Sequence, residues 1–232
     1  MKAWESNIRK VEPYVPGEQP KVQDVIKLNT NENPYGPSEN VRKAMEAIDI
    51  DRCRLYPDPD VTKLVKSIAD YYGMDNNQVF VGVGSDDVLS MCFLTFFNGK
   101  KPVLFPDITY SFYSVWADLY RIPYEKQKLD DNMKIVPEDY YKENGGVIFP
   151  NPNAPTGLLM DLDSVRDIIE HNKDVVVIVD EAYIDFGGVS AKDLVNEYDN
   201  VLVVQTFSKS RSMAASRRFR RISSATWSLR LR

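Results

Sequence analysis

One stretch decides the fold: Val201-Leu202-Val203-Val204-Gln205-Thr206-Phe207-Ser208-Lys209-Ser210-Arg211. Its first four residues are apolar and mostly β-branched, which predicts a strand buried on both faces, and the Ser-Lys pair after it predicts a loop. A lysine at the mouth of a buried strand is a candidate nucleophile, because partial desolvation disfavours the ammonium form and leaves an amine that can attack a carbonyl carbon. Taken alone, Lys209 fits a solvated surface lysine better, so its neighbours must decide.

Strand and helix patterns alternate through the chain before this stretch. Predicted strands cover residues 78–83, 102–105, 122–127, 146–149, 175–179 and 201–206. Predicted helices cover residues 38–48, 61–72, 88–97, 110–120, 137–142, 163–170 and 191–197. This order predicts an α/β fold, a mostly parallel sheet with helices on both faces. Ligands of such sheets bind outside the carboxyl ends of the strands, so the chemistry is expected there.

The composition excludes several classes of function. The chain has 232 residues, is 43% hydrophobic and 27% charged, and carries a net charge of −5, which indicates a globular protein without the basic footprint that nucleic acid requires. Two cysteines and one histidine argue against a disulfide framework, a histidine-based triad and a histidine-rich metal site. No leader or membrane-spanning pattern is found, so we expect a cytoplasmic protein of small-molecule metabolism.

Polar residues follow three of the predicted strands. They are Asn151-Pro152-Asn153-Ala154-Pro155-Thr156-Gly157, Asp180-Glu181-Ala182-Tyr183 and Ser208-Lys209. Pyridoxal phosphate needs this set: a lysine for its aldehyde, a carboxylate for its pyridine nitrogen, and donors near its phenolic oxygen. Each group also has an ordinary structural explanation, as a helix cap, a turn former or a core ring with a wet tip. Their occurrence together and in this order favours the cofactor.

The turn after residues 78–83 offers a phosphate site. Gly84 is followed by Ser85, Asp86 and a predicted helix, and this arrangement presents free backbone amides and the positive end of a helix dipole. Asp87 stands where the third glycine of a dinucleotide fingerprint would fall. The turn therefore predicts a phosphate site of another type, with Ser208 as a further donor, although an ordinary strand-to-helix connection explains the turn better when it is taken alone.

Four motifs together resemble those of the histidinol-phosphate aminotransferases, which are fold type I, class II pyridoxal-phosphate enzymes. These motifs are residues 29–38, 151–157, 179–183 and 206–210, and the resemblance extends over residues 14–214. It implies pyridoxal 5'-phosphate as cofactor, a small-molecule amino donor and a 2-oxo acid as substrates, and a homodimer. It implies no nucleic-acid or membrane partner and no metal.

The resemblance also implies roles for residues around the cofactor ring. Lys209 holds the aldehyde and moves the proton between substrate and cofactor carbons. Asp180 pairs with the pyridine nitrogen, Tyr183 pairs with the phenolic oxygen, and Tyr110 stacks on the ring. Relatives commonly have asparagine where this chain has Ala154, so Asn153 is the nearest substitute for that contact.

Further roles concern the phosphate and the substrate. The resemblance implies that Ser85, Asp86 and Ser208 hold the phosphate, and that Tyr56 reaches the phosphate of the neighbouring subunit. Arg217 falls where a phosphate-binding arginine is expected, but its flanking residues do not match. The residues implied to lie near the substrate are Tyr14, Asn33, Tyr35 and Gly36.

The two ends of the chain differ from the middle. We expect residues 1–36 to form an arm and a substrate-side turn, and residues 37–214 to form an incomplete cofactor-binding large domain. Residues 215–232 are basic and contain no acidic residue, and we interpret them as a frameshift or junction product, with a natural basic tail for an anionic partner as the rival. The sheet is then expected to lack its remaining strand or strands, and the small C-terminal domain is expected to be missing.

Two functions from different classes follow. The first is transamination of histidinol phosphate with 2-oxoglutarate in histidine biosynthesis, weak or absent in this short chain. Its closest competitors are an aromatic aminotransferase and a threonine-phosphate decarboxylase, which share the cofactor residues. The second is a non-catalytic remnant that binds the cofactor or pairs with a full-length subunit.

Overall fold

The computed structural model describes residues 26–215 throughout, residues 5, 6, 8, 9, 11, 12 and 17 before them, and the backbone of residues 225–229. Tyr14 and Arg217 lie outside this described part. The helices are α1 (Glu39–Glu46), α2 (Thr62–Tyr72), α3 (Ser85–Phe96), α4 (Phe112–Tyr120) and α5 (Leu162–His171), with 3-10 turns η2 (Ile50–Arg54), η3 (Asn76–Gln78), η4 (Pro137–Tyr140), η5 (Ile184–Phe186) and η6 (Ala191–Asn196).

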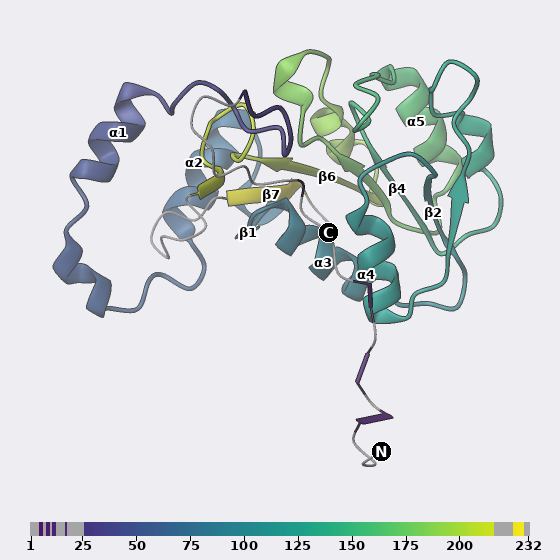
Figure 1. Ribbon diagram of the computed structural model, residues 1–232, viewed down its shortest axis with the longest axis horizontal. Helices are drawn as coiled ribbons and strands as arrows, with labels where there is room; N and C mark the ends of the chain where they lie inside the picture. Colours follow the sequence, from purple (N-terminus) through teal and green to yellow (C-terminus); the bar gives the residue numbers. More distant parts are fainter. Residues whose placement is uncertain are drawn as a thin grey trace.

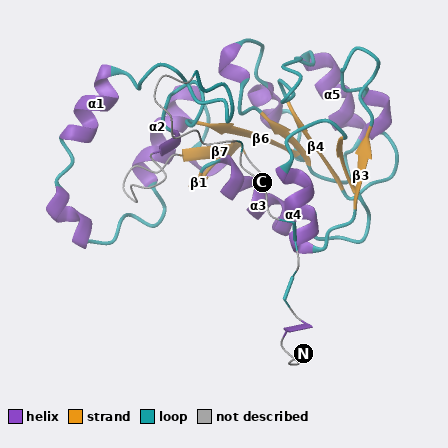
Figure 2. Ribbon diagram, in the orientation of Figure 1, coloured by secondary structure: helices purple, strands orange, loops and turns teal. Residues whose placement is uncertain are grey.

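A seven-stranded sheet forms the centre of the molecule (Figures 1 and 2). Its strands are β1 (Val79–Val83), β2 (Val103–Pro106), β3 (Tyr124–Gln127), β4 (Gly146–Pro150), β5 (Val177–Asp180), β6 (Val201–Thr206) and β7 (Ala225–Leu229). Their order is β1-β7-β6-β5-β4-β2-β3, and only the two pairings of β7 are antiparallel. The prediction of a mostly parallel sheet is therefore confirmed.

Alternate residues of the central strands face two separate cores. Val201 and Val203 pack with α2 and α5 on one face, whereas Leu202 and Val204 pack with α3 and α4 on the other. Because both faces are covered, all six residues of β6 are buried. The expected helices on both faces are thus present, and the polar loop after β6 begins where this double burial stops.

Local sequence explains where the helices begin and end. The Ser38 side chain accepts a hydrogen bond from the Val41 amide and caps α1, and α2 ends at Gly73, whose φ of 69° suits glycine. Residues 137–142 and 191–197, which we predicted as helices, form only the short 3-10 turns η4 and η6. Such short segments provide too few residues to offset helix nucleation.

The residues after position 214 overturn one expectation. We expected the sheet to lack its remaining strand or strands, but β7 comes from residues 225–229 and lies between β1 and β6. The sequence analysis did not predict this strand, because the basic segment in which it lies shows no clear strand pattern. Its backbone pairs with five residues of β1 and four of β6, so it connects β1 to the rest of the sheet.

One part of the chain projects away from the sheet. Figure 1 shows α1 and the turn after it at a distance from the strands, and neither α1 nor η2 has a buried residue. Within the described part of the chain, no helix is both long and apolar enough to span a bilayer.

Candidate functional site

The carboxyl ends of β1, β4, β5 and β6 lie at one edge of the sheet, because these four strands run in the same direction. At or just after these strand ends lie Ser85 and Asp86 at the start of α3, the 151–157 turn, Asp180 and Tyr183, and Ser208 and Lys209. The structure therefore brings to one edge most of the residues that the sequence analysis selected.

Asp180, the last residue of β5, is a buried carboxylate with defined partners. It is 4% exposed, its Oδ2 accepts a hydrogen bond of 2.7 Å from the Tyr113 hydroxyl, and its Oδ1 accepts one of 3.2 Å from the Ala182 amide. Burial raises the pKa of Asp180 to about 6, and the charge of Asp86 also raises it, while the two hydrogen bonds and the charge of Lys209 lower it. This group can accept or hold a proton near neutral pH.

The start of α3 forms the second part of the site. Gly84 precedes the helix with a φ of 94°, a conformation that suits glycine, and Ser85 and Asp86 open the first turn, at the positive end of the helix dipole. Asp86 accepts a hydrogen bond from the hydroxyl of Tyr110, which precedes α4. Ser208 lies buried after β6, with its hydroxyl bonded to that of Thr206.

Lys209 is held by the segment at residues 29–33. Its Nζ donates a hydrogen bond of 3.0 Å to the Thr30 carbonyl and lies 5.5 Å from the centre of the Tyr183 ring. Asn33 donates from its side chain to the carbonyls of Lys209 and Ser210, and Asn31 donates to the Tyr183 hydroxyl at 2.8 Å. Thus residues 179 positions apart in sequence meet at the amine.

A cavity of about 500 Å³ lies beside Tyr183. It is lined by Asn31, Pro152, Asn153, Ala154, Pro155, Gly157, Leu159, Tyr183, Phe186 and Gly187. Three polar side chains, those of Asn31, Asn153 and Tyr183, therefore face a space large enough for a small molecule.

Asn153 is committed to protein partners in this structure. Its Oδ1 accepts from the Thr109 hydroxyl, and its Nδ2 donates to the Ile108 carbonyl and to the Thr156 hydroxyl. These bonds fix the 151–157 turn against the loop before α4, and Asn153 is 2% exposed. The structure thus gives Asn153 a structural role and leaves its cofactor contact a prediction.

Several other predicted site residues lie apart from this group. Tyr56 is fully exposed, Tyr35 is 79% exposed, and Gly36 has no heavy atom within 4 Å of the position of a Cβ. Tyr14 and Arg217 fall outside the described residues. Of the predicted substrate-side residues in the described part, only Asn33 contacts the lysine loop.

Sequence reasoning missed Tyr113, Thr30 and Asn31. Tyr113 reads as an ordinary core aromatic, but it follows Tyr110 by three positions, the spacing of neighbours on a helix, and both hydroxyls reach carboxylates. That spacing was the available signal. Thr30 contributes a backbone carbonyl, which no side-chain pattern reveals.

Known proteins resemble this chain over most of its length. A family profile described as aminotransferase class I and II matches residues 23–218. The chain belongs to this family. It is 55% identical over 216 residues to the histidinol-phosphate aminotransferase of Clostridium beijerinckii, which covers 93% of this chain and 60% of that protein. With the enzyme of the same name from Lactococcus lactis subsp. cremoris strain SK11, identity is 51% over 215 residues, with coverages of 93% and 60%.

Solved structures show the same fold. The histidinol-phosphate aminotransferase of Sinorhizobium meliloti in complex with pyridoxal-5'-phosphate aligns with a TM-score of 0.78 at 19% identity, covering 87% of this aminotransferase-family chain and 55% of that chain. The enzyme from Clostridium acetobutylicum gives a TM-score of 0.76 at 22% identity, with coverages of 86% and 59%. The chain thus spans about 60% of the length of the curated relatives named above.

Proposed function

We propose that this chain is the cofactor-binding part of a pyridoxal-phosphate-dependent aminotransferase that acts on histidinol phosphate and 2-oxoglutarate. The observation that carries the proposal is the pair Asp180 and Lys209: Asp180 ends β5, Lys209 follows the neighbouring strand β6, and the charge of Lys209 lowers the pKa of Asp180. A buried carboxylate and an amine at adjacent strand ends are the groups that the pyridine nitrogen and the aldehyde of the cofactor require. The resemblance to relatives of that name supports the substrate.

The residues present fit this cofactor. When bound, pyridoxal phosphate supplies a ring that withdraws electrons from the carbon next to the transferred amino group. Asp180 holds a proton at the ring nitrogen, since it is buried and its oxygens face few other donors. The positive end of the α3 helix dipole, with the hydroxyls of Ser85 and Ser208, would bind the phosphate.

The remaining groups orient the reactants and move the proton. Tyr110 lies beside the start of α3, where its ring can cover one face of the cofactor, and Tyr183 presents its hydroxyl to the 500 Å³ cavity. With the cofactor bound, the Lys209 amine would be the base that moves a proton between the substrate carbon and the cofactor carbon. Before it can do so, its Nζ must give up the hydrogen bond to the Thr30 carbonyl.

A homodimer completes the proposal. Helix α1 and turn η2 bury none of their residues, and Ile50 and Tyr56 are 75% and 100% exposed. Helices this short are marginal in water without tertiary contacts, so a second copy of the chain is the surface that they need. In this dimer Tyr56 would reach the cofactor phosphate bound by the other copy. We also propose that the protein acts in the cytoplasm. Light scattering should give twice the mass of one chain.

Covalent labelling tests the proposed site. Protein incubated with pyridoxal phosphate and reduced with borohydride should carry the cofactor on Lys209, identified by peptide mass spectrometry, and Lys209→Ala should lose that label. Lys192→Ala is a matched control, because Lys192 pairs with Asp193 on η6. Label that is spread over several lysines, and that persists in Lys209→Ala, would contradict the proposal.

A substrate comparison then separates the candidate functions. The labelled site should convert histidinol phosphate, in a single half-reaction, faster than phenylalanine or threonine phosphate. Specific labelling of Lys209 without conversion of any amino donor would favour the non-catalytic remnant.

A further inference from the structure

We propose that Tyr113 is the positioning residue for Asp180: its hydroxyl orients the carboxylate at the end of β5 and keeps it ionised. The inference rests on the proposed function, since it concerns the group that would meet the cofactor nitrogen. In the sequence, Tyr113 is marked only by its spacing of three positions from Tyr110, and the assignment comes from the contacts.

The contact geometry is that of a strong hydrogen bond. The Tyr113 hydroxyl lies 2.7 Å from Asp180 Oδ2, both side chains are buried, and the Ala182 amide holds the other oxygen at 3.2 Å. A hydrogen bond from a hydroxyl to an ionised carboxylate is shorter and stronger than one between two neutral groups. Two donors on two different oxygens fix the rotation of the carboxylate and leave one lone pair on each oxygen for a ligand.

Tyr113 itself has little freedom to move. Its ring lies 6.3 Å from that of Phe93, 5.8 Å from that of Phe105 and 5.6 Å from that of Tyr110, in stacked or edge-on arrangements. These neighbours come from α3, from β2 and from the loop before α4, so three segments hold the ring in place. A packed aromatic ring keeps one rotamer, and its hydroxyl therefore points at Asp180 in every molecule.

The charges around Asp180 give this hydrogen bond a functional consequence. Burial and the charge of Asp86 on α3 favour the protonated carboxyl, while Lys209 after β6, the Ala182 amide and Tyr113 favour the ionised form. The pKa of Tyr113 is itself raised well above its ordinary value, first by burial and then by Asp180, so the hydroxyl stays a donor throughout the working range of pH. Without the Tyr113 hydroxyl, burial and the charge of Asp86 still raise the pKa of Asp180, and of the named partners only Lys209 and the Ala182 amide lower it.

The test is Tyr113→Phe compared with Tyr120→Phe. Tyr120 lies on the same helix, and its hydroxyl bonds to Ser90 instead of Asp180. The carboxyl carbons of cofactor-free protein, labelled with carbon-13 at aspartate, are followed by NMR against pH, and Asp180→Asn assigns the signal of Asp180. Tyr113→Phe should move this titration upward by about one pH unit, a tenfold change in proton affinity, and Tyr120→Phe should leave it in place. An unchanged titration in Tyr113→Phe would overturn the inference.

Cofactor binding separates this inference from the proposed function. Tyr113→Phe should bind pyridoxal phosphate more weakly than the parent protein at pH 7 and regain most of the affinity at pH 9, where Asp180 is ionised again; an equal deficit at both pH values would count against the inference. A shifted titration in a protein that never attaches the cofactor to Lys209 would support the role of Tyr113 and overturn the proposed function instead.

A second measurement covers a loss of stability. If Tyr113→Phe unfolds readily at pH 7, its deficit in urea midpoint relative to Tyr120→Phe is compared at pH 7 and pH 5. The deficit should shrink at pH 5, because the carboxyl is then protonated in both variants and the lost charged hydrogen bond no longer counts. A deficit of the same size at both pH values would show a packing role only and overturn the inference.

Discussion

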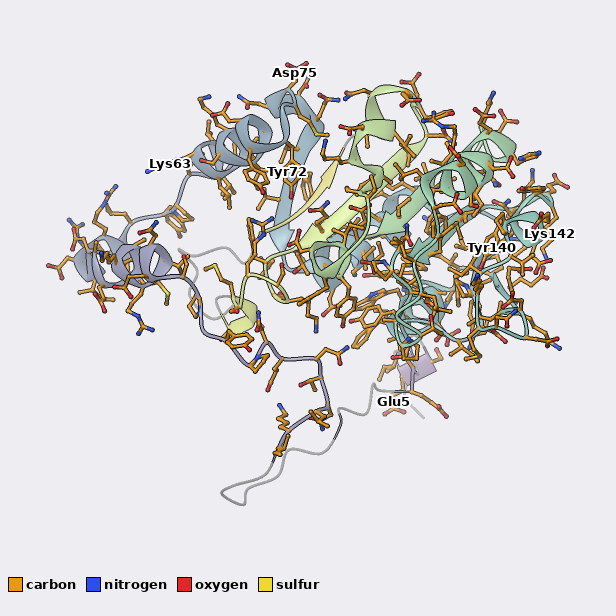
Figure 3. All side chains as sticks on the ribbon, turned by 90° about the horizontal axis from the view of Figure 1, so that it is seen from above. Glu5, Lys63, Tyr72, Asp75, Tyr140 and Lys142 are labelled. Atoms are coloured by element: carbon orange, nitrogen blue, oxygen red, sulfur yellow. The ribbon has the colours of Figure 1, made fainter. Side chains whose placement is uncertain are left out.

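At the scale of single residues, two adjacent carboxylates at the end of β5 have separate environments. Asp180 contacts Tyr113 in the core beneath α3 and α4, whereas Glu181 accepts hydrogen bonds from the Ser190 hydroxyl, the Ala191 amide and the Gln205 side chain. Gln205 in turn accepts from Tyr72, which projects from α2 toward the sheet in Figure 3. One strand end thus provides a group for chemistry on one side and a structural network on the other.

Glu181 makes the stability of the protein depend on pH. Burial raises its pKa to about 7, so its contribution to the free energy of unfolding is fully present below the pKa of the unfolded chain, near 4.5, and is lost as the pH rises through about 7. The parent protein, free of cofactor, should therefore lose about 2 kcal/mol from this group between pH 5 and pH 8.

Urea unfolding at several pH values checks this prediction. Glu181→Gln should show a decline with pH that is smaller by about that amount, while the exposed Glu138→Gln should keep the decline of the parent. Asp180 acts in the same direction, because burial raises its pKa to about 6, so some decline remains in Glu181→Gln. Parallel curves for all three proteins would contradict the assignment.

The residue scale also shows what the sequence could predict about the site. Lys209, Asp180 and Tyr183 were selected because polar residues after buried strands share one edge of a parallel sheet, and the structure brings them together. Tyr113 and the Thr30 carbonyl were not selected, because a pattern of apolar residues reports burial but not the partner of a hydroxyl or a backbone oxygen. Tyr56 and Tyr35 were selected by resemblance only, and in a single chain both side chains are largely exposed.

At the scale of elements, the strands and long helices were predictable because their apolar periodicity records which faces are buried. The pattern does not record which strand lies beside which, so the order β1-β7-β6-β5-β4-β2-β3 came only from the structure. The pattern also did not predict β7, because this strand is defined by the pairing of its backbone with β1 and β6.

Gly146 at the start of β4 is a position where the element constrains the sequence. Its φ is 144°, and a Cβ placed there would lie 2.2 Å from Cε1 of Phe97, a ring that is 1% exposed. Gly146→Ala should therefore destabilise the protein by about 2 kcal/mol or more, from backbone strain and from overpacking.

Gly99→Ala is the control for this prediction, since no heavy atom lies within 4 Å of its Cβ position. It should change the urea midpoint by an amount that corresponds to about 0.5 kcal/mol or less. Equal urea midpoints for the two alanine variants would mean that the Phe97 ring can move aside without loss of stability, which would contradict this prediction.

At the scale of the whole molecule, β7 determines whether the sheet is continuous. Among the described residues, β1 pairs with β7 and with no other strand. A chain shortened after Ala215 should lose both pairings, expose the edges of β1 and β6, and precipitate or be cut by protease faster than the parent. A chain shortened after Leu229 is the control and should behave like the parent. If the two shortened chains have the same solubility and the same cleavage rate, β7 contributes nothing to the sheet.

The same strand also acts as a spacer. The turn that precedes α3 follows β1, and the amine of residue 209 follows β6, with a single strand inserted between them. Neighbouring strands are separated by about 4.8 Å, so the two loops start about 10 Å apart. That span approximates the length of a small aromatic phosphate, so we expect the width of one antiparallel strand to set the size of a molecule that could contact both loops at once.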